Sequence, residues 1–320
     1  MCVISPIPRD GMLALLSVGT ASALLNPSIK RQSVALDTGV SMEWLSAAPQ
    51  TPSNTPAVLF VHGTFHGAWC WEAHWMERFA AAGVECHAIS LRGTSGSPVD
   101  QKSVKITEHV EDLRAFIDQA FADDAPPVLV GHSFGGASVL KYLEAEYPAR
   151  GAALLCSVPP SGNAPMVGRF LKRSLKQAWL ITRGFAMKSA ASDPVVCRDL
   201  FFDEKTPMDE IERYLPLLTA DAKVGLDVGH FTRNLPSKEA DYDGVAFWVE
   251  GSNVPTLVLG AERDGVVDRE GVEETARFLG EEAEFFDLPH DIMLCDGWEA
   301  PADRVIAFAK SLAGSKSGRS

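Results

Sequence analysis

The 320-residue sequence lacks several features that mark particular classes of protein. Its six cysteines include no C-x-x-C pair and no metal-type spacing, so Cys70, Cys86 and Cys156 are expected to be small buried residues in a reducing compartment. Positive charge is also scarce, with 29 Lys and Arg against 42 Asp and Glu and a net charge of −13. A duplex-binding surface needs clustered positive charge, so a nucleic-acid partner is excluded. No apolar run approaches the roughly 20 residues that span a bilayer.

The chain is rich in apolar residues, at 46 %, and can bury a large core. Short apolar runs alternate with stretches of helical spacing, which predicts a parallel sheet with helices on both faces. A hairpin is predicted around Thr38-Gly39. The further predicted strands are Ala57–Val61, Val84–Ser90, Pro127–Val130, Ala152–Val158, Val254–Gly260 and Glu284–Leu288, and the helices are Trp69–Ala82, Thr107–Phe121, Val272–Leu279 and Pro301–Leu312.

This alternation stops after Pro159-Pro160 and resumes near residue 250, and the intervening stretch has helical patterns without a buried strand.

The N-terminal stretch carries Ala21-Ser22-Ala23, which has the form of a cleavage site, so secretion, an organellar (plastid-type) presequence and an ordinary loosely docked leader all remain open. A cytoplasmic or organellar location is expected. The predicted division is a leader (1–30), an α/β core (31–160 and 247–313), a helical insertion (161–246) and a polar tail (314–320).

The strongest motif is Gly131-His132-Ser133-Phe134-Gly135, between an apolar strand and a helix. Strand, sharp turn with a serine at its apex, and helix form the nucleophile elbow, G-x-S-x-G. Glycines flank Ser133 because side chains there would collide where strand and helix cross. Ser133 is therefore the predicted nucleophile.

A serine hydroxyl needs a neighbouring base, and the base needs a group that fixes its tautomer. His290 follows the last predicted strand and is the candidate base. Asp264 competes with Asp268 and Asp291 as the orienting group, and it is the candidate because it lies directly after the preceding strand. The chain order Ser133, Asp264, His290 is the order of such triads on this kind of sheet.

The oxyanion that forms on an attacked carbonyl needs two preset N–H donors. Phe134, directly after the nucleophile, is predicted to supply one. Thr64, in the loop after the first buried strand, is predicted to supply the other, with Gly63 keeping the approach open. Phe65 and Phe134 are the predicted walls of the substrate pocket.

These motifs, with the Arg92-Gly93-x-x-Gly96 loop, resemble those of α/β-hydrolases with a helical cap, over residues 35–312. The segment from Val61 to Trp69 is similar to the oxyanion segment of plant methylesterases and hydroxynitrile lyases. The lyases, however, have threonine in place of Gly63, and lysine in place of Asp291 after the catalytic histidine.

The resemblance implies a serine ester hydrolase that acts on a small to medium, mostly apolar carboxylic ester, with neither cofactor nor metal. A cyanohydrin-type lyase, or a hydrolase-like receptor without turnover, remains the alternative. The oligomeric state stays open.

Several polar residues have plainer interpretations. His132 is expected to pack behind the elbow and His62 to be a hydrogen-bonded residue of its loop, while His66 could be structural or lie at the pocket edge. The carboxylates of Glu108, Glu111 and Asp112 are expected to form a solvated helix face.

The helical insertion carries six basic residues within twenty positions that contain no acid. Apolar residues are interleaved with them, and two interpretations stay open. The apolar residues could pack inward while the cations stay in water or pair with the acidic body, or the stretch could rest on anionic lipid. The basic residues are Arg169, Lys172, Arg173, Lys176, Arg183 and Lys188, and the apolar residues are Phe170, Leu171, Leu175, Ala178, Trp179 and Ile181.

Overall fold

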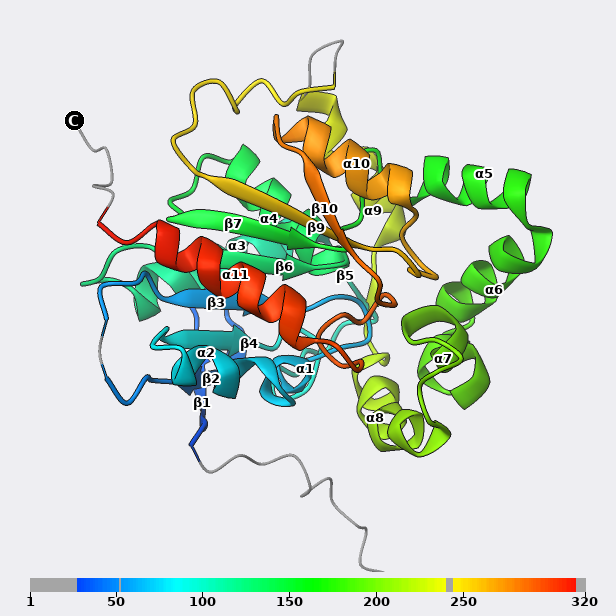
Figure 1. Ribbon diagram of the computed structural model, residues 1–320, viewed down its shortest axis with the longest axis horizontal. Coiled ribbons are helices and arrows are strands. Elements are labelled where there is room, and N and C mark those ends of the chain that lie inside the picture. The colour runs from blue at the N-terminus through cyan, green and yellow to red at the C-terminus, as the bar shows by residue number, and fades with distance from the viewer. Residues whose placement is uncertain (1–27, 52, 240–243, 315–320) are drawn as a thin grey trace, which may run out of the picture.

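The fold is built on an eight-stranded sheet in a computed structural model that describes residues 28–51, 53–239 and 244–314 (Figure 1). The predicted leader lies outside the described residues up to residue 27, as does the polar tail after residue 314. The strands lie in the order β1-β2-β4-β3-β6-β7-β9-β10. They are β1 (Lys30–Ala35), β2 (Ser41–Ala47), β3 (Val58–Val61), β4 (Cys86–Ile89), β6 (Val128–His132), β7 (Gly151–Leu155), β9 (Thr256–Ala261) and β10 (Ala283–Phe286).

The sheet is mostly parallel, as the sequence predicts. Among the described strands of this sheet, only the pairs β1–β2 and β2–β4 are antiparallel, because β2, the second strand of the predicted hairpin, runs opposite to the others. Every residue of β3, β6 and β7 is buried, which is why these strands read as continuous apolar runs rather than alternating ones.

Helices cover both faces of the sheet. Figure 1 shows α2 (Trp75–Ala81) and α11 (Glu299–Ser311) on the near face, with α3 (Ile106–Ala120) and α4 (Phe134–Glu144) behind it. The remaining core helices are α1 (Trp69–Glu72) and α10 (Arg269–Phe278).

The helix predicted over residues 69–82 is in fact two helices. His74 breaks it, with φ −145° and ψ −48°, and its ring stacks on Trp298 with centroids 5.0 Å apart. The helical spacing on either side of the break is unaffected, so the pattern in the sequence did not show it.

The segment between β7 and β9 forms a group of helices beyond the carboxyl ends of the parallel strands, at the right of Figure 1. We call residues 163–233 the cap. It is not entirely helical, because β8 (Gly225–Leu226) pairs with β5 (Ser103–Val104), a two-residue bridge too short to read from the sequence. Its helices are α5 (Asn163–Arg173), α6 (Leu175–Ala186), α7 (Pro194–Phe201), α8 (Met208–Asp221) and α9 (Val228–Arg233), with 3₁₀ turns at Ser189–Ala191 and, beyond the cap, Pro236–Glu239.

One expectation for α3 is wrong. Asp112 is fully buried rather than solvated, and it accepts two hydrogen bonds of 2.5 Å from the Arg92 guanidinium and one of 2.5 Å from Thr38. A buried carboxylate is tolerated when it is paired and hydrogen-bonded, and Arg92 supplies both conditions. Glu108, at the helix start, also contacts Arg92, whereas Glu111 is exposed as expected.

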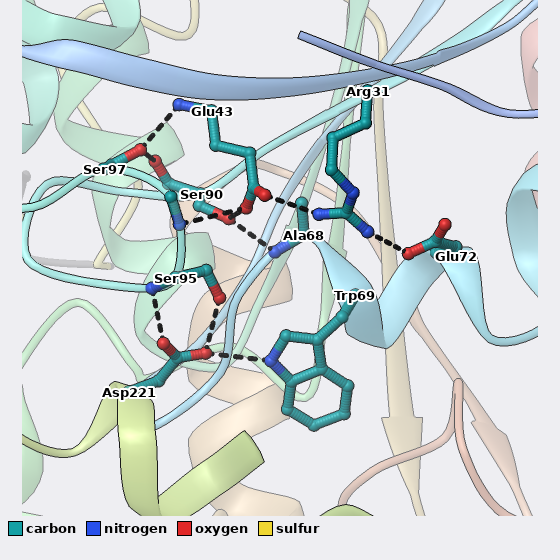
Figure 2. A network of polar contacts seen from close by, with 10 residues as sticks. Arg31, Glu43, Ala68, Trp69, Glu72, Ser90, Ser95, Ser97 and Asp221 are labelled. Atoms are coloured by element: carbon teal, nitrogen blue, oxygen red, sulfur yellow. Dashed lines mark hydrogen bonds and ion pairs between the residues drawn. The ribbon is translucent and has the colours of Figure 1, made fainter. Parts of the chain in front are cut away.

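The N-terminal hairpin is fixed to the core by an arginine between two carboxylates (Figure 2). The Arg31 guanidinium donates to Glu43 and to Glu72, each at 2.5 Å. Glu43 also accepts a bond of 2.5 Å from Ser90 at the end of β4. Burial raises the pKa of Glu72, and the charge of Arg31 acts in the opposite direction. The network thus joins β2, α1 and the loop after β4.

Candidate active site

Ser133 stands at the junction of β6 and α4 in a strained conformation, with φ 53° and ψ −120°. Backbone angles of this kind are costly for a residue with a side chain and concentrate at functional sites. The flanking glycines are required sterically. A Cβ on Gly131 would lie 2.7 Å from Gly136 Cα, and a Cβ on Gly135 would lie 2.3 Å from the Val61 carbonyl oxygen. The turn therefore needs glycines at the two positions that the motif gives them.

The structure brings the three predicted triad residues together. His290 Nε2 lies 3.0 Å from Ser133 Oγ, and His290 Nδ1 lies 2.8 Å from Asp264 Oδ2. The backbone N–H groups of Val266 and Val267 donate to the other carboxylate oxygen of Asp264, each at 2.7 Å. The side chains of His290 and Asp264 are buried. Asp264 is thus held so that His290 carries its proton on Nδ1 and presents Nε2 to the hydroxyl.

Cys156 lies directly beside this group, at the end of β7. Burial, with the nearby Asp264 carboxylate, raises the pKa of its thiol well above the usual value. Its sulfur and ring nitrogens of His132 and His290 lie within 4.8 Å of one another, the one cluster of metal-ligand type among the described residues. It does not suit a metal, because the thiol stays protonated and both nitrogens of His290 already have partners.

The loop after β3 holds the predicted oxyanion donors. His62 Nδ1 lies 2.8 Å from the Gly63 carbonyl oxygen, and His62 Nε2 accepts a bond of 2.9 Å from the Leu91 N–H. Burial lowers the pKa of His62 to about 3, so the ring is neutral and Nδ1 donates to Gly63. Because the peptide between Gly63 and Thr64 is planar, holding its oxygen on one side directs the Thr64 N–H to the other.

In the described parts of the chain, neither the Thr64 N–H nor the Phe134 N–H donates a hydrogen bond. Both residues line the cavity that contains Ser133. Phe134 is also the first residue of α4, where the helix dipole favours negative charge. Two unengaged donors beside Ser133 would suit an oxyanion that forms there.

A buried pair links this loop to Asp291, the residue after His290, and the sequence did not predict it. His66 Nδ1 contacts the Thr64 carbonyl oxygen at 2.8 Å, and Nε2 lies 3.0 Å from Asp291 Oδ2. Burial opposes the charged form of His66, but Asp291 outweighs it and raises the pKa. Burial likewise opposes the charge on Asp291, and His66 holds that pKa below its usual value. His66 is therefore structural and charged, and its partner directly follows His290.

His132 behaves as predicted. It is fully buried behind the elbow, and its Nε2 lies 3.0 Å from the His290 carbonyl oxygen. Burial lowers its pKa to about 3, with the neighbouring His290 acting in the same direction. A neutral ring there avoids a second cation beside the base.

The cavity above Ser133 has a volume of about 270 Å³ and lies between the elbow and the cap. Phe65 is not among the residues that line it. Phe65 stacks on Phe185 at a centroid distance of 5.6 Å and lines a separate cavity of about 40 Å³ with His62 and Phe134. The walls of the larger cavity are Thr64, Phe134, Val158, Asn163, Met166, Val167, Ile181, Thr182, Phe185, Ala186, Leu226, Val228 and Val266.

Asp221, the last residue of α8, fastens the cap to the core (Figure 2). Its carboxylate accepts bonds from Trp69 Nε1 at 2.8 Å, from the Ser95 N–H at 2.5 Å and from Ser95 Oγ at 2.8 Å. The approach depends on Gly67, where a Cβ would lie 2.1 Å from Ser95 Oγ. Nothing in the sequence marks Asp221, because its partners lie more than 120 residues away.

The fold and this site define the class of protein. The chain belongs to the alpha/beta hydrolase family, whose model matches residues 58–308. Among the described residues, no helix is both long and apolar enough to cross a membrane.

Known proteins that resemble the chain include esterases. It is 29% identical to Methylesterase 10 of Arabidopsis thaliana over 116 residues, which are 34% of this chain and 40% of that protein. It is 27% identical to the carbendazim hydrolyzing esterase of Nocardioides sp. (strain SG-4G) over 133 residues, 35% of this chain and 52% of that protein. These matches span about half of each relative, or less. A thermophilic esterase from Thermogutta terrifontis has a similar structure, with a TM-score of 0.64, 18% identity and coverage of 89% of this chain and 99% of that one, which shows the fold alone.

Proposed function

We propose that the protein is a serine ester hydrolase that works through Ser133, His290 and Asp264. The observation that carries the proposal is that His290 joins Ser133 Oγ at 3.0 Å and Asp264 at 2.8 Å beneath a cavity. Ser133 attacks the acyl carbon while His290 takes its proton, and Asp264 stabilises the imidazolium. The Thr64 and Phe134 N–H groups receive the oxyanion. His290 then protonates the leaving alcohol, and water releases the acyl-enzyme, so neither metal nor cofactor is required.

The cavity supports a small to medium, mostly apolar carboxylic ester as the substrate. Its walls are largely aliphatic and aromatic, and among the described residues no charged side chain lines it. An ionic substrate would lose its hydration there without compensation. The relatives named as esterases support the same chemistry. A thioester or amide would use the same groups, and an acyl-donor panel distinguishes them.

Two observations argue against the lyase alternative. A Cβ on Gly63 would lie 2.8 Å from Ser133 Cβ, so the threonine found there in the lyases would displace the nucleophile. Asp291, which stands where those enzymes have lysine, is fully buried and engaged with His66. A cation at that position would face charged His66 rather than the cavity.

The test is pre-steady-state turnover of p-nitrophenyl esters of increasing acyl length, with Ser133→Ala as the blank. A burst of p-nitrophenol equal to the enzyme concentration, absent in Ser133→Ala, is the expected result. Cyanohydrin cleavage without ester turnover would support the lyase instead. Ligand retention with no turnover of either substrate would support the receptor.

A further inference from the structure

The tip of the cap, formed by α5 and α6, exposes large apolar side chains. The sequence alone left open whether these side chains pack inward or face lipid. Phe170, Ala178 and Ile181 are buried, as inward packing predicts. The other large side chains point outward: Leu171 is 51%, Leu175 75%, Trp179 64% and Met187 68% exposed. Figure 1 shows α5 and α6 at the outer right of the molecule, away from the sheet. Inward packing therefore accounts for only part of the stretch.

The exposed residues of α6 lie on the same helix face as two residues that line the Ser133 cavity. Leu175, Trp179, Thr182 and Ala186 recur at intervals of four, three and four residues, so they share one face of the helix. Thr182 and Ala186 line the cavity.

The same holds for α5. Asn163, Val167 and Leu171 recur every four residues along one face, and the first two line the cavity. Each of the two helices thus carries exposed apolar residues and cavity-lining residues along one face.

The basic residues of this region fall into two groups, those with a polar partner and those without an acidic one. Arg169, Arg173 and Arg183 form ion pairs with carboxylates, and Lys188 donates to two backbone carbonyl groups. Lys172 and Lys176 are exposed, and no carboxylate of the described residues pairs with either. No Asp or Glu occurs in the sequence between Glu146 and Asp193. Two unpaired cations therefore flank the apolar tip of an otherwise acidic protein.

We propose that this tip docks on an anionic lipid surface. The docking surface consists of Leu171, Lys172, Leu175, Lys176, Trp179 and Met187. Tryptophan favours the boundary between headgroups and acyl chains, lysine extends its ammonium to the headgroups, and each cation near such a surface contributes about 1 kcal/mol.

A second copy of the chain fits this surface less well. A stable protein–protein interface uses roughly 20–30 residues on each side, far more than this tip offers. Two chains of net charge −13 would also repel each other. With lipid as the occupant, the cavity mouth faces the membrane. The substrate is then a lipid-like ester, a step that rests on the proposed function.

The experiment is flotation of the full chain with vesicles of phosphatidylcholine and phosphatidylserine, compared with phosphatidylcholine alone, at low and high salt. The protein should float with the anionic vesicles at low salt and lose binding at high salt. Leu175→Ser with Trp179→Ser should abolish flotation. Phe247→Ser is the matched control, because Phe247 is 63% exposed but lies outside the cap, and it should float like the parent protein.

Lysine neutralisation tests the charge separately. Lys172→Gln with Lys176→Gln should weaken vesicle binding about 30-fold, the equivalent of about 1 kcal/mol for each lysine. Lys102→Gln with Lys310→Gln, two exposed lysines outside the cap, should have no effect. Ser133→Ala should float normally, so the docking result does not depend on ester hydrolysis. Absence of flotation at low salt would overturn the proposal. The proposal would also be overturned if the Leu175/Trp179 variant bound vesicles as well as the parent protein. A dimer that depends on the docking surface, detected by light scattering without lipid binding, would overturn it as well.

Discussion

His66 Nε2 lies 3.0 Å from Asp291 Oδ2, and through this contact the loop after β3 is tied to the residue after His290. The second nitrogen of His66 contacts the carbonyl oxygen of Thr64 at 2.8 Å. A neutral imidazole can donate only once, whereas the charged ring donates to both partners. The raised pKa of His66 and the lowered pKa of Asp291 agree with the charged form. We therefore expect His66 and Asp291 to position the neighbouring groups rather than to react.

Asp291→Asn should lower kcat by about 10- to 100-fold with little change in KM, because misplacement of catalytic groups slows the reaction more than it weakens binding. Steady-state kinetics on a short-chain p-nitrophenyl ester measure the split. Asp296→Asn removes an exposed acid of the same loop and should behave like the parent. A change in KM alone would contradict the positioning role.

Substitution of the triad should show unequal losses. Ser133→Ala or His290→Ala should reduce kcat by about 10⁴-fold or more, and Asp264→Ala by less, because His290 keeps its contact with Ser133. Steady-state turnover of p-nitrophenyl esters measures kcat for each variant. Ester turnover by Ser133→Ala near the parent level would refute the assignment of the nucleophile.

His62→Ala should lower kcat by about 10²- to 10³-fold, the typical effect of losing one oxyanion donor. Without the ring, the Gly63 carbonyl loses its bond of 2.8 Å and the Thr64 N–H is no longer directed. KM should change little, because the donor acts on charge that develops in the transition state. His74→Ala, which removes a half-buried histidine that stacks on Trp298, is the control. Equal losses in the two variants would indicate a general effect on folding.

Acid should destabilise the protein through buried neutral histidines. The pKa is lowered by burial to about 3 in His62 and His132 and to about 4 in His109. Below pH 6.5 the unfolded chain binds protons at these rings and the folded chain does not, so stability present above pH 6.5 is lost as the pH falls. Each proton contributes a slope of about 1.4 kcal/mol per pH unit. His66 acts in the opposite direction, because Asp291 raises its pKa in the folded state and its contribution to stability is lost as the pH rises rather than as it falls.

Urea unfolding between pH 7 and pH 4.5, a range set by the ordinary histidine pKa of about 6.5, measures this slope. His109→Gln should flatten it by one proton relative to the parent. An identical slope in His109→Gln would mean that this histidine is charged in the folded protein.

Asp221→Ala should loosen the cap. The change leaves the Trp69 and Ser95 donors without their acceptor, and each buried unsatisfied group costs about 1–3 kcal/mol. Hydrogen exchange should rise in α8 and in the Ser95 loop before the rest of the molecule. Glu212→Ala, at an exposed position of the same helix, should leave exchange unchanged. Uniform destabilisation would show that Asp221 supports the whole fold rather than the junction.

The sequence predicted the sheet, and it singled out Ser133, Asp264 and His290, which the structure brings together, because their signals are local. A glycine-flanked turn after an apolar run, and polar residues directly after strands, can be read within a few residues. Phe65 was predicted to line the cavity and does not. Its proximity to Thr64 in the sequence does not decide whether its ring faces the cavity or stacks on Phe185.

Pairs that join distant segments could not be predicted in the same way. Periodicity assigns Asp112 to a helix face, but the counter-charge of Arg92, which makes its burial favourable, comes from another loop. The partners of Asp221 and Asp291 are likewise set by tertiary contacts. The exposure of Trp179 depends on how α5 and α6 pack together. The interleaved pattern of basic and apolar residues is compatible with either a buried or an exposed Trp179.

The protein offers two chemically independent reporters, the buried cysteines and Ser133. All five described thiols are buried and their pKa values are raised, so alkylating reagents, which attack thiolates, should react only when the chain opens. A fluorophosphonate, by contrast, should label an activated Ser133 in the folded state. With Cys2, which lies outside the described residues, replaced by serine, one sample could report site occupancy through the phosphonate and unfolding through the thiol reagent. Cys156, beside Asp264, would then report the opening of the triad itself.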